Sequence, residues 1–280
     1  MASDRDFREP AVILTHDNAD FDAVAGLLAA SKLFLEATPV LPARLNRNVR
    51  EFLSLYADVL PFVEAKTLPK QKIALAILVD TQSANPVRGM GPTTRLHIID
   101  HHPRSESLPE TATYEGAQVG AVTTLLVERL RERGIELPTV EASLLLLGIH
   151  EDTGSLTYQG TTPQDVRAAA WLLEQGASLE IVETFLRTPL TTEQQALYTR
   201  LVNEAEIVRI QERTILVAAA RLEHYVEELA SVVHKLVDLF DPDAAFLLAE
   251  YEGAVQIVAR STTDAIDVGD IVRRLQGGGH

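Results

Sequence analysis

Residues 96–105 read LHIIDHHPRS, and this stretch decides what kind of fold surrounds it. Its apolar start predicts a buried strand, yet the strand runs directly into Asp100, His101 and His102. Burying a carboxylate beside two imidazoles is costly unless these groups are paired or hold a cation. We therefore expect a functional site at the end of this strand, provided that other segments reach the same place.

The segments around this stretch alternate between strand and helix patterns. Near-continuous apolar runs predict buried strands at residues 11–15, 73–79 and 96–100. Runs with helical spacing separate and follow them, as in DAVAGLLAASKLFLEA and PTVEASLLLLGIHEDTG. Apolar strands that alternate with helices predict an α/β fold, with helices on both faces of a mostly parallel sheet.

The pattern changes near Pro189, which interrupts the chain. Thr191 or Thr192 can cap a helix that begins after it. Farther along, strand pairs joined by short turns, with interspersed helices, predict a second, smaller α/β domain. The expected organisation is a first domain over residues 1–188, a linker helix over 189–205 and a second domain over 206–280.

The composition limits the sites that the chain can form. It has 280 residues, a formal net charge of −15 and no cysteine, which excludes disulfides and thiolate metal sites and favours a cytoplasmic location. The acidic balance argues against a broad surface for long nucleic acids, whereas a metal can still hold a small phosphate ligand locally. No apolar run approaches the ~20 residues of a membrane span, so we expect no membrane partner.

Four acidic motifs have related positions in the predicted fold. They are His16 with Asp20 and Asp22, then Asp80, then Asp100 with His101 and His102, and finally Asp152. The first three motifs follow predicted strands, and the carboxyl ends of parallel strands meet at one edge of a sheet, where such folds bind ligands. Asp152 would reach this edge from the end of a helix.

Each motif also has a simpler structural interpretation when it is taken alone. Asp20 or Asp22 could cap the following helix, and Asp80 could be a turn residue. We interpret His97 and His150 as strand and helix residues outside the site. Five converging carboxylates would repel one another without cations, and two divalent metals would remove that repulsion. A donor set of carboxylates and imidazoles suits Mn²⁺, with Mg²⁺, Co²⁺ or Zn²⁺ as alternatives.

These motifs resemble those of the DHH family of phosphoesterases, named for the Asp-His-His triplet. The family pattern of His-x-x-x-Asp-x-Asp, a lone Asp after a hydrophobic strand, the triplet and Asp-Thr-Gly is present in order. The C-terminal part resembles the family's DHHA1 substrate domain through Arg260-Ser261 and the motif Gly277, Gly278, Gly279 and His280. The N-terminal half also resembles the DHH module of fusion proteins that contain paired CBS domains and a tRNA nucleotidyltransferase.

In the family, the Gly-Gly-Gly-His motif is followed by a further helix start and a last strand. We therefore expect either further domains in a longer protein or a small domain without its final element. The resemblance also implies a role for each motif. One metal would be held by His16, Asp20 and Asp80, and a second by Asp22, Asp80, His101 and Asp152.

The remaining motif residues would act on the substrate. By resemblance, His102 would contact the scissile phosphate or protonate the leaving oxygen, and Asp100 would orient the neighbouring histidine. Arg260, Ser261 and the glycine motif would bind a substrate phosphate, because glycine allows close backbone approach and arginine binds phosphate through two bonds. Taken alone, Arg260 could instead be a surface charge, and the glycines a flexible tail.

Three functions are open on this basis. The first is a Mn²⁺-dependent phosphodiesterase or exonuclease that acts on short oligonucleotides, dinucleotides or 3′-phosphoadenosine 5′-phosphate. The second is a module that binds nucleotide or RNA within a larger fusion protein. The third is a manganese-dependent inorganic pyrophosphatase, which the Gly-Gly-Gly-His ending disfavours. The sequence also leaves a homodimer open.

Overall fold

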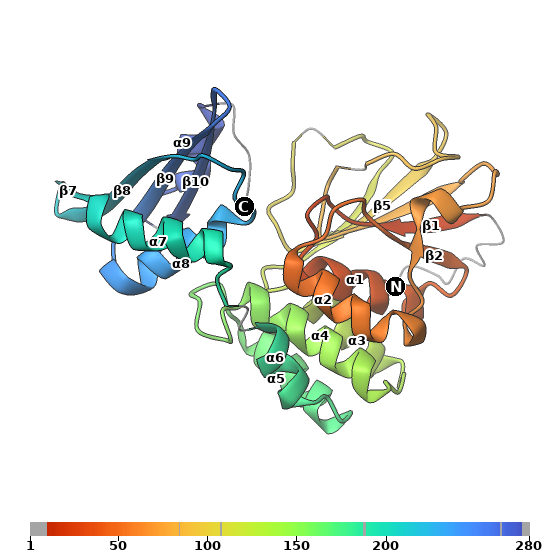
Figure 1. Ribbon diagram of the computed structural model, residues 1–280. Helices are drawn as coiled ribbons and strands as arrows, with labels where there is room; N and C mark the ends of the chain where they lie inside the picture. The colour runs from red at the N-terminus through yellow and green to blue at the C-terminus, as the bar shows by residue number, and fades with distance from the viewer. Residues whose placement is uncertain (1–9, 84, 107, 187–188, 264, 276–280) are drawn as a thin grey trace. The chain divides into compact units, whose positions relative to one another are not determined.

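The computed structural model describes residues 10–275 apart from 84, 107, 187–188 and 264 (Figure 1). The chain divides into two compact units, Met1–Thr188 and Pro189–His280. The predicted phosphate-binding motif Gly277 to His280 lies outside the described residues.

The first unit is built on a six-stranded parallel sheet with the strand order β3-β2-β1-β4-β5-β6. The strands are β1 (Ala11–Leu14), β2 (Ala37–Leu41), β3 (Val63–Glu64), β4 (Leu75–Val79), β5 (Arg95–Asp100) and β6 (Thr113–Gly116). The chain proceeds outward from β1 on one side and from β4 on the other. The loops after β1 and β4 therefore separate at a topological switch point, where open α/β sheets form their ligand crevice.

Helices cover one face of this sheet (Figure 1). They are α1 (Phe21–Leu33), α2 (Arg47–Tyr56), α3 (Val122–Glu132), α4 (Thr139–Asp152), α5 (Pro163–Glu174) and α6 (Leu179–Leu186). Ile13, Ile77 and Ile99 project from the sheet into the core that these helices form. The helix α1 is buried along most of its length between the sheet and its neighbours, because Ala and Leu dominate its sequence.

The α/β class and the parallel sheet agree with the prediction. Helices were expected on both faces, but among the described residues the second face, which carries Val12, Leu78 and Ile98, is covered differently from the first. Apolar residues of the connecting segments pack there, including Val87 between β4 and β5 and Leu108 between β5 and β6. Among the described residues, the long helices of this unit therefore flank the sheet on one side, and loops close the other (Figure 1).

The helices α1 and α4 approach each other closely at Gly148. A Cβ atom at this position would lie 2.8 Å from the Cβ atom of Ala25 and 3.1 Å from the Cα atom of Asp22. Only glycine leaves room for this contact, which is closer than ordinary carbon–carbon contacts of about 3.5–4.0 Å. Because Asp22 lies in the first turn of α1 and Asp152 ends α4, the contact brings these two carboxylates to the same end of the helix pair.

The second unit contains a four-stranded sheet with the order β10-β9-β8-β7. Its elements are α7 (Thr192–Glu204), β7 (Glu206–Ile210), β8 (Arg213–Arg221), α8 (Leu229–Phe240), β9 (Ala244–Tyr251), β10 (Ala254–Ser261) and α9 (Val268–Arg273). The strands β7 and β8 form one hairpin and β9 and β10 another, whereas β8 and β9 are parallel. Within the described residues, no helix combines the length and apolarity needed to cross a membrane.

The expected linker helix is part of the core of the second unit. Thr191 is the residue that caps α7, in a capping box with Gln194. Leu197 and Leu201 of α7 are buried against α8 and the sheet. The helix therefore follows the boundary between the units without being a free connection.

Candidate metal centre

The predicted site residues of the first unit gather at the carboxyl ends of β1, β4 and β5. His16 and Asp20 follow β1, Asp80 follows β4, and Asp100 ends β5. The backbone of Asp80 is left-handed, with φ of 57°, and its N–H donates to the carbonyl of Ile99 at 3.1 Å. Left-handed backbone is uncommon outside glycine and is found where a site requires a particular side-chain direction.

A first ligand group consists of His16, Asp20 and Asp80, whose potential ligand atoms lie within 4.8 Å of one another. The Nε2 atom of His16 is 3.2 Å from Oδ2 of Asp80. Asp20 also caps α1, because its Oδ1 accepts a 3.0 Å hydrogen bond from the N–H of Ala23. The Asp20 carboxylate therefore both caps α1 and belongs to the ligand group.

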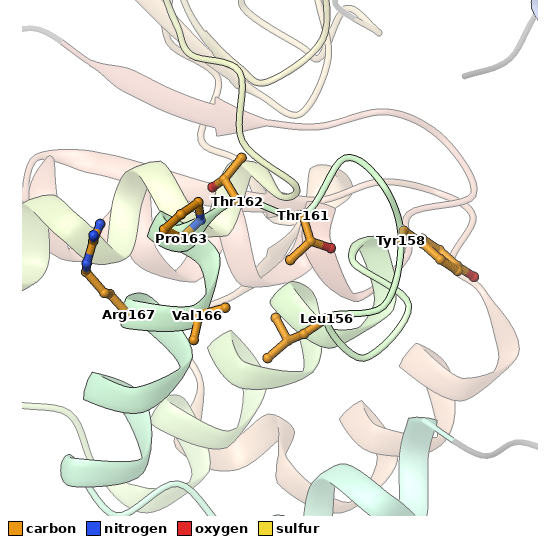
Figure 2. Close-up of a pocket in the computed structure, with 7 residues that line it drawn as sticks. All are labelled: Leu156, Tyr158, Thr161, Thr162, Pro163, Val166 and Arg167. Carbon is orange, nitrogen blue, oxygen red and sulfur yellow. The ribbon is translucent and has the colours of Figure 1, made fainter. Parts of the chain in front are cut away.

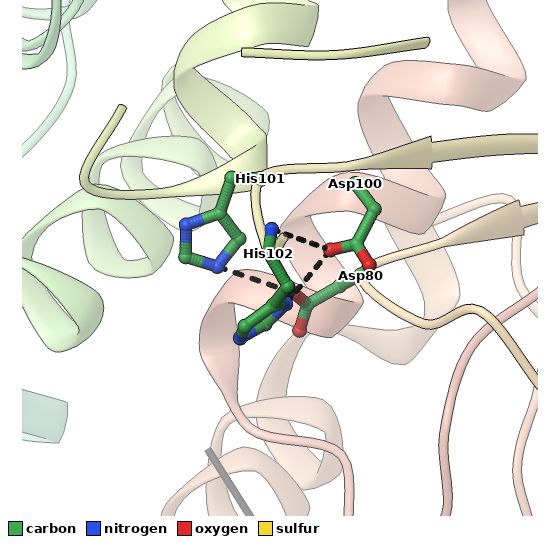
Figure 3. Close-up of side chains that lie close together, drawn as sticks. All are labelled: Asp80, Asp100, His101 and His102. Atoms are coloured by element: carbon green, nitrogen blue, oxygen red, sulfur yellow. Dashed lines mark hydrogen bonds and ion pairs between the residues drawn. The ribbon is translucent and has the colours of Figure 1, made fainter. Parts of the chain in front are cut away.

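A second ligand group consists of Asp22, His101 and Asp152. The Nε2 atom of His101 lies 3.3 Å from Oδ2 of Asp152, 3.5 Å from Oδ1 of Asp80 and 4.0 Å from Oδ2 of Asp22. The Nδ1 atom of the same ring is 3.1 Å from the carbonyl of Val119, which directs Nε2 toward the carboxylates. Figure 3 shows the His101 ring turned toward Asp80. Asp80 therefore lies between the two groups.

Asp100 and His102 form a hydrogen-bonded pair, and together with Asp80 and His101 they offer a third set of potential ligand atoms within 4.8 Å of one another (Figure 3). Oδ1 of Asp100 accepts from Nδ1–H of His102 at 2.8 Å and from its backbone N–H at 3.2 Å. Oδ2 of Asp100 accepts from the side-chain amide of Gln82 at 2.8 Å. These bonds hold the Asp100 carboxylate against the His102 ring, an arrangement that suits orienting this histidine.

The electrostatics of the cluster fit a bound cation. Oδ1 of Asp80 and Nε2 of His101 are buried, and neither makes a hydrogen bond within the described part of the chain. Burial, reinforced by neighbouring carboxylates, raises the pKa of Asp20 and of Asp22 well above the ordinary range. Burial disfavours charged His101, but Asp152 and Asp80 outweigh this effect and raise its pKa to about 12. The cluster thus attracts positive charge, and its oxygen and nitrogen donors fit divalent metals.

Two further residues, Glu151 and Gln82, support the centre and were not predicted from the sequence. Oε2 of Glu151 accepts from the N–H of Phe21 at 2.5 Å, and its Oε1 accepts from Asn48. Gln82 joins Asp100 to the next turn, because its Oε1 accepts from the N–H of Ser105 at 2.7 Å. Glu151 immediately precedes Asp152, and this adjacency was the only available signal for it.

The two histidines interpreted as lying outside the site belong to no ligand group among the described residues. The Nδ1 atom of His97 lies 2.8 Å from the hydroxyl of Thr113, on the neighbouring strand β6. His150 lies on α4, where burial lowers its pKa. Their predicted exclusion is compatible with these positions.

A pocket of about 550 Å³ lies next to the segment that follows Asp152 (Figure 2). Leu156 and Val166 contribute apolar side chains to its lining, and Thr161 contributes a hydroxyl-bearing one. None of the described site residues predicted from the sequence lines this pocket. The pocket and the ligand groups therefore share no residue.

The predicted substrate-binding residues that the structure describes are on the second unit. Arg260 and Ser261 end β10. The hydroxyl of Ser261 donates to the carbonyl of Thr263 at 2.6 Å and accepts from its N–H, so it stabilises the turn after the strand. Burial and the charge of Arg260 lower the pKa of His234 on α8.

Comparisons with known proteins connect the chain to one family. Residues 10–149 match the family described as "DHH family, N-terminal domain". The chain is 39% identical over 275 residues to the A-adding tRNA nucleotidyltransferase of Geobacter sulfurreducens, which covers 96% of this chain and 31% of that protein. The corresponding enzyme of Aquifex aeolicus is 34% identical, covering 97% of this chain and 32% of that protein. The chain thus spans about a third of the length of these curated relatives.

More distant similarity extends to a probable pyrophosphatase and to a solved exopolyphosphatase-related protein. A probable manganese-dependent inorganic pyrophosphatase of Brevibacillus brevis is 32% identical over 181 residues, covering 61% of this chain and 57% of that protein. A solved exopolyphosphatase-related protein of Bacteroides fragilis has a TM-score of 0.75 at 15% identity, covering 97% of this chain and 85% of that chain. At this identity, the structural match supports the fold alone.

Proposed function

Because the chain belongs to the DHH family, we propose that its metal centre hydrolyses phosphate esters of short oligonucleotides, dinucleotides or 3′-phosphoadenosine 5′-phosphate. Family membership supports the broader type, a metal-dependent phosphoesterase. The observation that carries the proposal is the convergence of two ligand groups on Asp80. We propose Mn²⁺ as the metal, with Mg²⁺ or Co²⁺ as alternatives, and the manganese-dependent relatives support this choice.

His16, Asp20 and Asp80 would hold one metal ion. Asp22, His101 and Asp152 would hold the other together with Asp80. When bound, two divalent metals supply Lewis-acid activation of a phosphate ester and of the attacking water.

His102 would act on the leaving oxygen. Its Nδ1–H is retained by Asp100 at 2.8 Å, so proton exchange with a substrate is left to Nε2. From Nε2 the ring can donate a proton to the leaving oxygen as the phosphorus–oxygen bond breaks. Gln82 and the hydroxyl of Tyr114, which donates to the carbonyl of His102 at 2.7 Å, hold this turn in place. The same bonds position the imidazole for each turnover.

The second unit would recognise the substrate. We propose that Arg260 binds a substrate phosphate, because a guanidinium can pair with two phosphate oxygens at once. The glycine motif, Gly277 to His280, would supply backbone N–H groups to the same ligand. Recognition of a phosphate at one end of the ligand favours short substrates.

Two alternatives have specific support. A nucleotide- or RNA-binding module is favoured by the 39% identity to an A-adding tRNA nucleotidyltransferase across 96% of this chain. An inorganic pyrophosphatase is favoured by the 32% identity to a probable manganese-dependent pyrophosphatase, which extends over 61% of this chain. Both alternatives use the same ligand groups, so activity measurements must separate them.

The test measures product release from a panel of substrates, in reactions that contain either Mn²⁺ or a chelator. Chromatography quantifies the products. The panel contains 5′-phosphorylated dinucleotides, a 5-mer RNA, a cyclic dinucleotide, 3′-phosphoadenosine 5′-phosphate and pyrophosphate. We expect metal-dependent release from the nucleotide substrates, loss of release in Asp80→Ala, and normal release in Asp58→Ala, an exposed aspartate outside the ligand groups. Faster hydrolysis of pyrophosphate than of every nucleotide would favour the pyrophosphatase. Tight nucleotide binding without turnover would favour the binding module.

A further inference from the structure

One short segment, residues 119–124, orients two members of the second ligand group through its backbone. The carbonyl of Val119 lies 3.1 Å from Nδ1 of His101. The N–H groups of Val122 and Thr123, at the start of α3, donate to the two carboxylate oxygens of Asp22 at 2.7 and 3.0 Å. Any displacement of this segment would therefore move His101 and Asp22 together.

The same segment also touches the third member of the group through its neighbour. A Cβ atom on Gly120 would lie only 2.6 Å from the side-chain methyl of Thr153, so the Gly120 backbone packs directly against that residue. Thr153 follows Asp152 and is fully buried. The segment thus bonds directly to Asp22 and His101, and it reaches Asp152 through the neighbouring Thr153.

A buried carboxylate from a different helix anchors this segment. Asp165 lies in the first turn of α5 and is 0% exposed. Its oxygens accept from the N–H of Gly120 at 3.1 and 3.0 Å and from the hydroxyl of Thr124 at 2.6 Å. It also accepts from the N–H and hydroxyl of Thr162 at 2.6 and 2.7 Å, as part of the capping box of α5. Capping explains the bonds to Thr162, whereas those to Gly120 and Thr124 have no role in starting α5.

We propose that Asp165 is a positioning residue for the second metal, which it serves by fixing residues 119–124 and, through them, Asp22, His101 and Asp152. This inference rests on the proposed metal centre. It predicts that the two metals respond differently to loss of Asp165, which a general loss of stability would not produce. The bonds described above join the segment to Asp22 and His101 of the second group. Loss of Asp165 should therefore weaken one metal and spare the other.

The test is Mn²⁺ binding to the full chain, measured by titration calorimetry and by electron paramagnetic resonance. The unaltered protein is expected to bind two Mn²⁺. Asp165→Ala should keep one tight Mn²⁺ and bind the second about 10–100-fold more weakly, the usual effect of removing a residue that orients a metal ligand. Adding His16→Ala to this variant should then remove the remaining tight metal, which identifies it as the metal of the first group.

Two further variants separate positioning from folding. In Asp165→Asn the amide NH₂ would face the N–H of Gly120 in either orientation, because that N–H contacts both oxygens. This variant should also weaken only the second metal, and it provides the test where Asp165→Ala does not fold. Thr162→Ala removes the hydroxyl contacts of the cap but keeps the backbone N–H bond of residue 162 and the bonds of Asp165 to Gly120 and Thr124, so it should lower the melting temperature and leave both metal affinities unchanged.

The outcomes distinguish this inference from the proposed function. Unchanged binding of both metals in folded Asp165→Ala or Asp165→Asn would overturn the inference alone, as would equal weakening of both metals. Weakening of the second metal by Thr162→Ala to the same extent would also overturn it, because the effect would then follow from α5 stability. No Mn²⁺ binding by the unaltered protein would overturn the proposed metal centre and this inference together.

Discussion

Replacing Gly148 with alanine tests whether the close contact between α1 and α4 sets the geometry of the metal centre. The new Cβ atom would lie 2.8 Å from the Cβ atom of Ala25, whereas ordinary carbon–carbon contacts are about 3.5–4.0 Å. The two atoms are fixed to their helix backbones, so the helices must separate by on the order of 1 Å. This separation would move Asp22 on α1 away from Asp152 on α4.

The effects on stability partly cancel. Alanine favours a helix over glycine by about 1 kcal/mol, and an overpacked contact costs about 1–3 kcal/mol. We expect the free energy of unfolding to fall by no more than about 2 kcal/mol in Gly148→Ala. The effect on function should be larger, because metal sites require distances within about 0.2 Å and a misplacement of about 1 Å can reduce rates about 100-fold.

Urea unfolding, Mn²⁺ titration and nucleotide turnover measure these effects separately. The matched control is Gly148→Ala combined with Ala25→Gly, which removes the opposing Cβ atom and should recover part of the metal affinity. Recovery would be partial because the hydroxyl of Thr123 also lies 2.8 Å from the new atom. Normal Mn²⁺ affinity and turnover in the single variant would refute the reasoning, as would a double variant no better than the single one.

Three other predictions follow from the structure. Mn²⁺ at about 100 times its dissociation constant should stabilise the first unit by about 2.7 kcal/mol per site, or roughly 5–10 °C in a thermal melt, and Asp80→Asn should abolish most of this shift. Asp100→Asn should lower kcat about 10–100-fold while two Mn²⁺ still bind in calorimetry, because it alters the acceptor for His102 and Gln82 and none of the residues proposed to hold the two metals. Thr191→Ala should destabilise the second unit by about 1 kcal/mol in urea unfolding, with Mn²⁺ affinity unchanged. An unshifted melt, lost metal binding or unaltered unfolding, respectively, would contradict each prediction.

The sequence predicted the elements that local patterns determine. Near-continuous apolar runs identified the buried strands β1, β4 and β5, because both faces of these strands are covered. A parallel sheet then requires the residues after these strands to meet at one edge, and His16, Asp80 and Asp100 do so. The loop coverage of the second face was not predicted, because the apolar residues of those loops are scattered without a period.

The supporting bonds of the site could not be read from the sequence. The carbonyl of Val119 and the N–H groups of Val122 and Thr123 belong to the backbone, which has no sequence signature. The sequence offers a sufficient local role for Asp165, the capping box of α5, and therefore gives no sign of its bonds to Gly120 and Thr124. Gln82 and the linker helix illustrate the same limit, because only tertiary packing reveals what a side chain or helix touches.

The spread of the proposed ligands along the chain has a consequence for protein synthesis. The first group, His16, Asp20 and Asp80, is complete in sequence when residue 80 has been made, whereas Asp152 emerges from the ribosome much later. A nascent chain that ends before α4 therefore lacks one carboxylate of the second group and the helix contact at Gly148. Capture of the proposed second metal would then report that α4 has docked.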